Sequence, residues 1–304
     1  MPQQPLSPSV SPAPAPASGA DGLASRRTAL KLALGVGYAA TLSPGMAQTL
    51  IRTSDGGLTT GTEIYDVAGS TVPFYYAAPY GKTGLPVLLL AHDIFGLGDH
   101  IKDVARRFAK AGYLVVVPDL YARQGDASTY TDVAQLMADI ISKVPDAQLM
   151  DDLDGALQWA ADNGGDPLRV GITGFCSGGR LTWLYAERSD TIKAAVAWYG
   201  LLTGNRSELT PQQPLDLAAQ IKVPTLGLYG AQDNIATLDA LAQMKAALAA
   251  AGRQGNAAAK ASRFLVYPKA GHAFYQDRRP TYQKEAAEDG FKRALAWFKA
   301  KGVA

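Results

Sequence analysis

Past residue 48, the hydrophobic positions fall into two kinds of segment that alternate along the chain. Short runs rich in aliphatic and β-branched residues have little polar interruption, which is typical of strands buried on both faces. Longer segments between them carry apolar residues at i, i+3 and i+4 spacing, which is typical of helices with one buried stripe. The predicted strands span residues 72–79, 86–93, 113–119, 169–175, 192–200, 224–230 and 262–268, and the predicted helices span 99–112, 146–163, 237–252 and 282–302.

The order of these segments predicts an α/β fold with a mostly parallel central sheet and helices on both faces. Strand and helix follow one another in turn, which favours right-handed crossovers between parallel strands. The first run, VPFYYAAP at 72–79, alternates and is aromatic, so we expect an edge strand there. In such a sheet, catalytic groups gather at the carboxyl ends of the strands.

The N-terminal 47 residues have the pattern of an export signal. Residues 1–24 are rich in Pro, Ser and Ala without a hydrophobic period, so we expect them to be disordered. SRRTALK at 25–31, an apolar stretch at 32–42 and GMA before Gln48 form a twin-arginine-type signal peptide. We therefore expect a periplasmic or secreted protein that meets the twin-arginine export machinery in transit. The alternative is a cytoplasmic protein with a basic tail.

The remaining residues, 48–304, are enough for a single domain with a sizeable core. The net charge of +2 comes from the N-terminal segment, in which Arg26, Arg27 and Lys31 face one acidic residue, Asp21. The rest of the chain has no basic stripe and no second long apolar segment, which argues against nucleic acid as a partner and against a stable membrane anchor.

The only cysteine, Cys176, stands at a predicted strand-to-helix corner. The sequence GFCSG at 174–178 is the thiol version of the nucleophile elbow G-x-S-x-G, in which small neighbours permit a strained turn that exposes the nucleophile. We expect the following helix to begin near Gly179 and to present its N-terminus to the sulfur, which favours the thiolate. The alternative is a buried cysteine that acts as a small apolar side chain.

Two further residues complete a candidate catalytic triad. Asp233 follows the strand at 224–230 and His272 follows the strand at 262–268, in the order nucleophile, acid, histidine that this fold requires. Each also has a structural interpretation, since Asp233 could cap the next helix and His272 could bind a loop carbonyl. The amides of Ser177 and of Ile94, in the loop after the strand at 86–93, are the expected oxyanion donors.

No metal or cofactor is expected. His92 and His100 lack a second ligand at a metal-like spacing, so we interpret both as structural or rim residues. Phe95, Tyr121 and Tyr199 are candidates for the pocket wall, with ordinary core packing as the alternative for each.

From about Tyr65 to Lys301 the sequence resembles the dienelactone hydrolase (carboxymethylenebutenolidase) family of the α/β-hydrolase fold. The resemblance is carried by HDIFGLGDHIKDVARRFAKAGYLVVVPDLYARQGD, GFCSGG, YGAQD and AGHAFY. It implies a nucleophile at Cys176, an acid at Asp233 and a base at His272.

The resemblance also implies roles for three positions near the triad. Asp93 stands where the family carries a carboxylate, usually Glu, that helps control thiol ionisation. Arg123 stands where a family arginine holds a substrate carboxylate. Gln276 replaces a second family arginine, and Arg278 and Arg279 lie close by.

The expected activity is hydrolysis of a lactone or ester through a thioester on Cys176. One alternative is a broad short-chain carboxylesterase or thioesterase, which fits the same residues. The other is a non-catalytic thiol-reactive or ligand-binding protein on the same scaffold, in which Cys176 senses oxidants.

Overall fold

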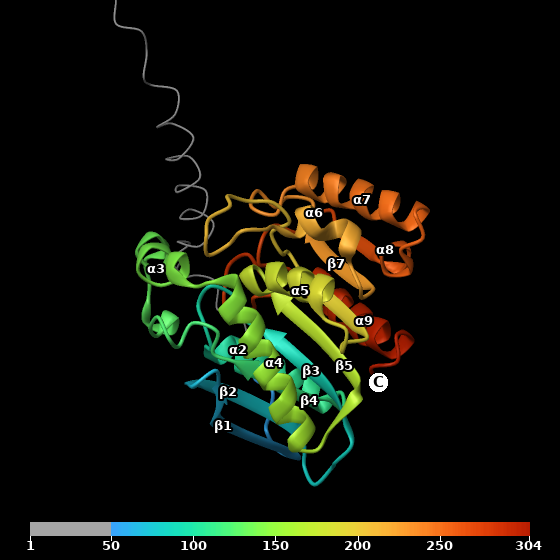
Figure 1. The fold of residues 1–304 in the computed structure, drawn as a ribbon. Coiled ribbons are helices and arrows are strands. Elements are labelled where there is room, and N and C mark those ends of the chain that lie inside the picture. The colour runs from blue at the N-terminus through green and yellow to red at the C-terminus, as the bar shows by residue number, and fades with distance from the viewer. Residues whose placement is uncertain (1–49) are drawn as a thin grey trace, which may run out of the picture.

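The computed structural model describes residues 50–304, and eight strands of this part form one sheet (Figure 1). The strands are β1 (Leu58–Val67), β2 (Ser70–Pro79), β3 (Leu85–Ala91), β4 (Leu114–Pro118), β5 (Gly165–Phe175), β6 (Ala194–Trp198), β7 (Thr225–Gly230) and β8 (Arg263–Tyr267). Their order in the sheet is β1-β2-β4-β3-β5-β6-β7-β8. The β1/β2 and β2/β4 pairs are antiparallel and the other pairs are parallel, so the predicted mostly parallel α/β sheet is confirmed.

Helices connect the strands and cover both faces of the sheet. The α-helices are α2 (Asp99–Lys110), α3 (Val133–Asp139), α4 (Asp146–Asp162), α5 (Ser177–Arg188), α6 (Pro214–Leu217), α7 (Leu238–Arg253), α8 (Ala257–Ala261) and α9 (Lys284–Ala300). Short 3₁₀ turns lie at η1 (Ala127–Thr129), η2 (Ile141–Lys143) and η3 (Ala218–Gln220). Figure 1 shows α4 and α5 in front of the sheet. On the other face, Phe108 of α2 packs against Phe291 and Phe298 of α9.

Strand β5 shows how closely the two helical layers approach the sheet. A Cβ atom on Gly171 would lie 2.8 Å from the Phe298 ring of α9, and one on Gly174 would lie 2.2 Å from the carbonyl oxygen of Gly178 in α5. Positions three apart on a strand face opposite sides of the sheet. Both helical layers therefore press on β5, which agrees with the unbroken burial of its last six residues.

Two differences from the sequence prediction concern the edge of the sheet and the start of α5. The strand predicted as an edge, β2, lies inside the sheet, because β1 pairs with it along its whole length and forms the edge instead. Helix α5 begins at Ser177, two residues before the predicted start at Gly179, because the chain turns into the helix immediately after Cys176.

The predicted disordered extension and signal peptide, residues 1–47, lie outside the described residues. Within 50–304, none of the helices combines the length and the apolar character that crossing a membrane requires.

Candidate active site

Cys176 occupies a strained corner between β5 and α5. Its φ and ψ angles are 55° and −112°, which non-glycine residues rarely adopt. A Cβ atom on Gly178 would lie 2.1 Å from the carbonyl oxygen of Ala91, and Gly174 is equally crowded, so neither position has room for a side chain. The glycines of the G-x-C-x-G pattern thus allow the close approach of β3, β5 and α5 that holds the thiol at this corner.

Asp233 and His272 lie next to each other in the loops after β7 and β8. The Nδ1 atom of His272 is 2.9 Å from Oδ2 of Asp233, and both side chains are buried. The other carboxylate oxygen, Oδ1, accepts hydrogen bonds from the amides of Ile235 and Ala236, each at 2.8 Å. Since an ionised carboxylate only accepts, Nδ1 of His272 carries the proton and Nε2 is left for the thiol.

The pKa of His272 is set by its burial and by its two neighbours, Cys176 and Asp233. Burial disfavours the imidazolium and lowers the pKa of His272, but the Cys176 charge, together with hydrogen bonds to Asp233 and Cys176, outweighs this and raises the pKa to about 10. A buried imidazolium next to a thiolate is the charge state of an activated cysteine nucleophile. The site can therefore supply a nucleophile and a proton donor together.

The cavity in front of the thiol, here called the Cys176 cavity, has a volume of about 220 Å³ and is lined by both expected oxyanion donors, Ile94 and Ser177. Ser177 is the first residue of α5, so its amide has no acceptor within the helix. Its hydroxyl lies 3.1 Å from the Tyr121 hydroxyl, and Tyr121 also lines the cavity. Most of the remaining wall is aliphatic, from Leu120, Met137, Ile141, Val144, Leu149, Leu181, Leu201 and Ile235.

Asp93 lies in a neighbouring cleft of about 470 Å³ and helps to shape the loop after β3. Its Oδ1 accepts the amide of Phe95 at 2.9 Å, and its carbonyl accepts the amide of Gly96 at 3.3 Å. Burial above all, and the charges of Asp93 and Cys176 in addition, raise the pKa of Tyr199. The charges of Asp93 and Cys176 thus both act on the buried hydroxyl group of Tyr199.

The structure does not bring the predicted substrate clamp, Arg123, to the Cys176 cavity. Its Nη1 and Nη2 atoms bind the two carboxylate oxygens of Asp152 at 2.8 and 2.7 Å, and the Asp152 side chain is fully buried. This pairing ties the loop after β4 to α4 and uses the face of the guanidinium that would hold a substrate carboxylate.

Two of the three aromatic candidates also lie elsewhere. Phe95 lines the Asp93 cleft, with the guanidinium of Arg279 4.2 Å from its ring centre. Tyr199 is buried and packs edge-on against His272, with ring centres 5.1 Å apart, so it supports the base instead of lining the cavity. Gln276 is buried and lines the Asp93 cleft together with Arg278 and Arg279.

Arg180 and Asp146 line the cavity but were missed by the sequence analysis. Arg180 binds both oxygens of Asp146, at 2.7 and 2.8 Å, and its Nε donates to Gln213 at 2.8 Å. The spacing offered one signal, because a residue four positions after Cys176 lies on the same side of α5. Nothing in the sequence pattern indicated the partner of Arg180 on α4.

Both remaining histidines hold structure together. His92 accepts the amide of Leu120 at Nε2, at 3.0 Å, so its Nδ1 donates to the carbonyl of Asp93 at 2.7 Å. His100 binds the buried carboxylate of Asp277 at 2.9 Å. Among residues 50–304, His, Cys, Asp and Glu side chains form no group of three that could hold a metal ion.

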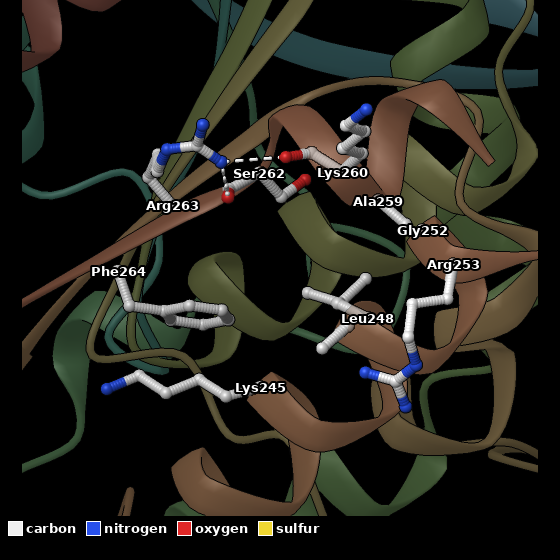
Figure 2. A pocket seen from close by; sticks show the side chains of 10 residues that line it. Lys245, Leu248, Gly252, Arg253, Ala259, Lys260, Ser262, Arg263 and Phe264 are labelled. Carbon is white, nitrogen blue, oxygen red and sulfur yellow. Dashed lines mark hydrogen bonds between the residues drawn. The ribbon is translucent and has the colours of Figure 1, made fainter. Parts of the chain in front are cut away.

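A larger cavity, of about 690 Å³, lies away from this chemistry between α7, α8 and the beginning of β8. Figure 2 shows Arg263 in its wall, hydrogen-bonded to the carbonyl oxygens of Lys260 and Ser262. Since β8 runs parallel to β7, this cavity faces the amino ends of the strands, opposite the end that carries Cys176 and His272.

Comparison with known proteins agrees with the fold and with the family resemblance of the sequence. The sequence profile described as "Dienelactone hydrolase family" matches residues 72–302. A Methylorubrum extorquens protein named "Putative carboxymethylenebutenolidase" is 48% identical over 284 residues, which cover 92% of this chain and 94% of that protein. An Escherichia coli protein of the same name is 46% identical over 267 residues, 88% of this chain and 96% of that protein. A crystal structure titled "Putative Dienelactone Hydrolase", from Klebsiella pneumoniae, superposes with a TM-score of 0.76 at 44% identity and covers 80% of this chain and 98% of that one.

Proposed function

The chain belongs to the dienelactone hydrolase family of hydrolases, which act on lactone or ester bonds, and we propose that it does so through a thioester on Cys176. The observation that carries this proposal is the 2.9 Å contact between His272 and Asp233, which sets the imidazole toward a thiol held at a strained corner. The proposed triad is Cys176, His272 and Asp233.

In the first step, the Cys176 thiolate attacks the carbonyl carbon of the lactone or ester and a carbon–sulfur bond forms. The developing oxyanion accepts hydrogen bonds from the amides of Ile94 and Ser177. The carbon–oxygen bond then breaks, and the imidazolium of His272 donates its proton to the departing oxygen. In a lactone this oxygen remains tethered to the acyl group.

In the second step, neutral His272 takes a proton from water, and the hydroxide formed attacks the thioester carbon. The carbon–sulfur bond breaks, the carboxylic acid leaves and the thiolate–imidazolium pair is restored. Asp233 keeps the Nδ1 proton of His272 in place through both steps. We assign Asp93 the role of influencing the balance between thiol and thiolate; the support is that its charge acts together with that of Cys176 on the buried Tyr199.

The experiment is steady-state hydrolysis of an enol lactone and of p-nitrophenyl acetate under reducing conditions, with Cys176→Ala beside the wild type. We expect turnover of the lactone and its loss in the variant. A wild type that turns over p-nitrophenyl acetate alone would favour the broad esterase. Turnover retained in Cys176→Ala contradicts Cys176 as the nucleophile. Absence of turnover on both substrates contradicts the proposed activity and favours the thiol-reactive or ligand-binding alternative.

We also propose that residues 25–47 direct export through the twin-arginine pathway, so that the protein acts in the periplasm or outside the cell. The support is the sequence SRRTALK followed by a short apolar stretch. Replacing both Arg26 and Arg27 by Lys in the full chain should leave the protein in the cytoplasmic fraction. Equal export of this variant and the wild type would contradict the proposal.

A further inference from the structure

The wall of the Cys176 cavity offers an incoming substrate mainly aliphatic surface. Side chains of α3, α4, α5 and the neighbouring loops converge here, Met137, Leu149 and Leu181 among them. A cavity of this composition favours the transfer of apolar groups out of water. It disfavours an ion, because an anion that enters loses its hydration and must find a compensating charge.

The two charged side chains among the described lining residues neutralise each other. The Asp146 carboxylate takes both outer nitrogens of Arg180, and a third donor of Arg180, Nε, is used by Gln213. Nη2 of Arg180 also donates to the carbonyl of Gln212 at 2.9 Å. Arg180 therefore has little capacity left to bind a substrate carboxylate.

Neither Arg123 nor the acidic groups next to the thiol attract an anion to the cavity. Asp152 occupies both outer nitrogens of Arg123, which does not line the cavity. In the proposed mechanism Cys176 reacts as an anion, and Asp93 is a second acidic side chain that acts with it on the buried Tyr199. The cation that pairs with the thiolate, His272, already faces both Cys176 and Asp233. Among the residues that the structure describes around the thiol, a substrate carboxylate therefore meets no positive charge that is not already balanced.

We infer that the Cys176 cavity selects neutral, apolar lactones or esters over those that carry a carboxylate. This inference rests on the proposed function and names its substrate class. The volume of the Cys176 cavity, about 220 Å³, limits the size of the substrate group that can enter. An apolar cavity of about 150 Å³ accepts benzene, so this one has room for a six-membered ring with a short alkyl substituent.

The test uses two substrates that differ in charge alone. One is an enol lactone that carries a carboxylate on its exocyclic double bond, and the other is its primary carboxamide, which has nearly the same shape. For the wild-type protein we expect kcat/KM to be at least tenfold higher on the carboxamide. Equal values, or a preference for the carboxylate, overturn the inference even where Cys176→Ala abolishes both activities and the proposed function stands. No Cys176-dependent turnover of either compound overturns the proposed function and the inference with it.

Asp146→Asn tests the neutralised pair directly. It removes the negative charge from the cavity wall and leaves the cation of Arg180, so the preference for the carboxamide should fall at least fivefold. The matched control is Asp166→Asn, which weakens the 2.7 Å Arg169–Asp166 pair at the far end of β5 and should leave the preference unchanged. An unchanged preference in a folded Asp146→Asn variant counts against the inference.

A second pair of variants covers the case in which Asp146→Asn does not fold. Met137 is half-buried in the cavity wall on α3, where a longer polar side chain can reach solvent. Met137→Lys adds a cation and should shift the preference toward the carboxylate, whereas the neutral Met137→Gln should not. The same preference in both variants would show that charge does not govern selection.

Discussion

Asp233 uses its two carboxylate oxygens for two different tasks, and His272 receives only one of them. Oδ1 accepts the amides of Ile235 and Ala236, while Oδ2 lies 2.9 Å from Nδ1 of His272. The backbone of this loop therefore holds the Asp233 carboxylate in place independently of its contact with the imidazole. Because β7 and β8 are adjacent and parallel, the loops that follow them bring these two residues together.

Asp233→Asn should separate the two tasks. An asparagine oxygen can still accept the amides of Ile235 and Ala236, but the amide nitrogen presented to His272 donates, which favours the wrong tautomer. We expect kcat to fall by about a thousandfold or more with little change in melting temperature. Activity within tenfold of the wild type would mean that Asp233 does not orient His272.

The pKa of His272 should depend on Cys176. Because the Cys176 charge is the largest influence that raises this pKa to about 10, Cys176→Ala should lower it clearly. NMR titration can measure this, since the chain has three histidines, and His100, bound to Asp277, serves as the internal control. An identical titration of His272 in both proteins would contradict the coupled pair.

The same raised pKa links His272 to folding stability. A base whose pKa is higher in the folded state stabilises that state fully below its ordinary pKa of about 6.5, and this contribution is lost as pH rises through about 10. In Cys176→Ala the free energy of unfolding should therefore vary less with pH over this interval.

Arg123→Met should affect stability through Asp152, which is fully buried and would lose its partner. Breaking a buried ion pair costs about 3–5 kcal/mol, and we expect a loss of this order in the free energy of unfolding at neutral pH. The double variant with Asp152→Asn should recover most of it, because no buried charge remains. A substrate clamp at Arg123 would instead show as a raised KM for carboxylate substrates with unchanged stability.

Glu187 should make the protein less stable as pH rises. Its side chain is 5% exposed, neither carboxyl oxygen has a hydrogen-bond partner, and burial raises its pKa from 4.5 to about 9. An acid of this kind is protonated in the folded state, so the free energy of unfolding falls between pH 4.5 and 9, by up to about 1.4 kcal/mol per pH unit. Glu187→Gln should flatten this dependence in urea unfolding at pH 5, 7 and 9. Parallel profiles for the two proteins would show that Glu187 does not titrate in this range.

The hydrophobic pattern was enough to predict the buried parallel strands and the loops that carry Cys176, Asp233 and His272. It did not predict β1, because this edge strand is only partly buried and its polar residues hide the period. It placed the start of α5 near Gly179, two residues late. Helix α5 already includes Gly178 and Gly179, which allow its close contact with the backbone of Ala91 and Trp198.

The charge pairs could not be predicted, because their members are far apart in the chain. Arg123 meets Asp152, 29 residues away, and Arg180 meets Asp146, 34 residues away, only once α4 has packed on the sheet. A motif position states which residue type is present. Tertiary packing determines which side chain that residue pairs with. Here it determines whether an arginine is available to bind substrate or is already paired within the protein.

His92 joins the two loops that follow β3 and β4. One imidazole holds the carbonyl of Asp93 and the amide of Leu120, and its ring packs edge-on against Tyr121 at 4.8 Å. His92 therefore links the loop of Ile94, whose amide would stabilise the oxyanion, to the loop of Tyr121, which lines the Cys176 cavity. We therefore expect a substitution that moves Tyr121 and widens the Cys176 cavity to shift the Ile94 amide as well, so that substrate range and turnover rate change together.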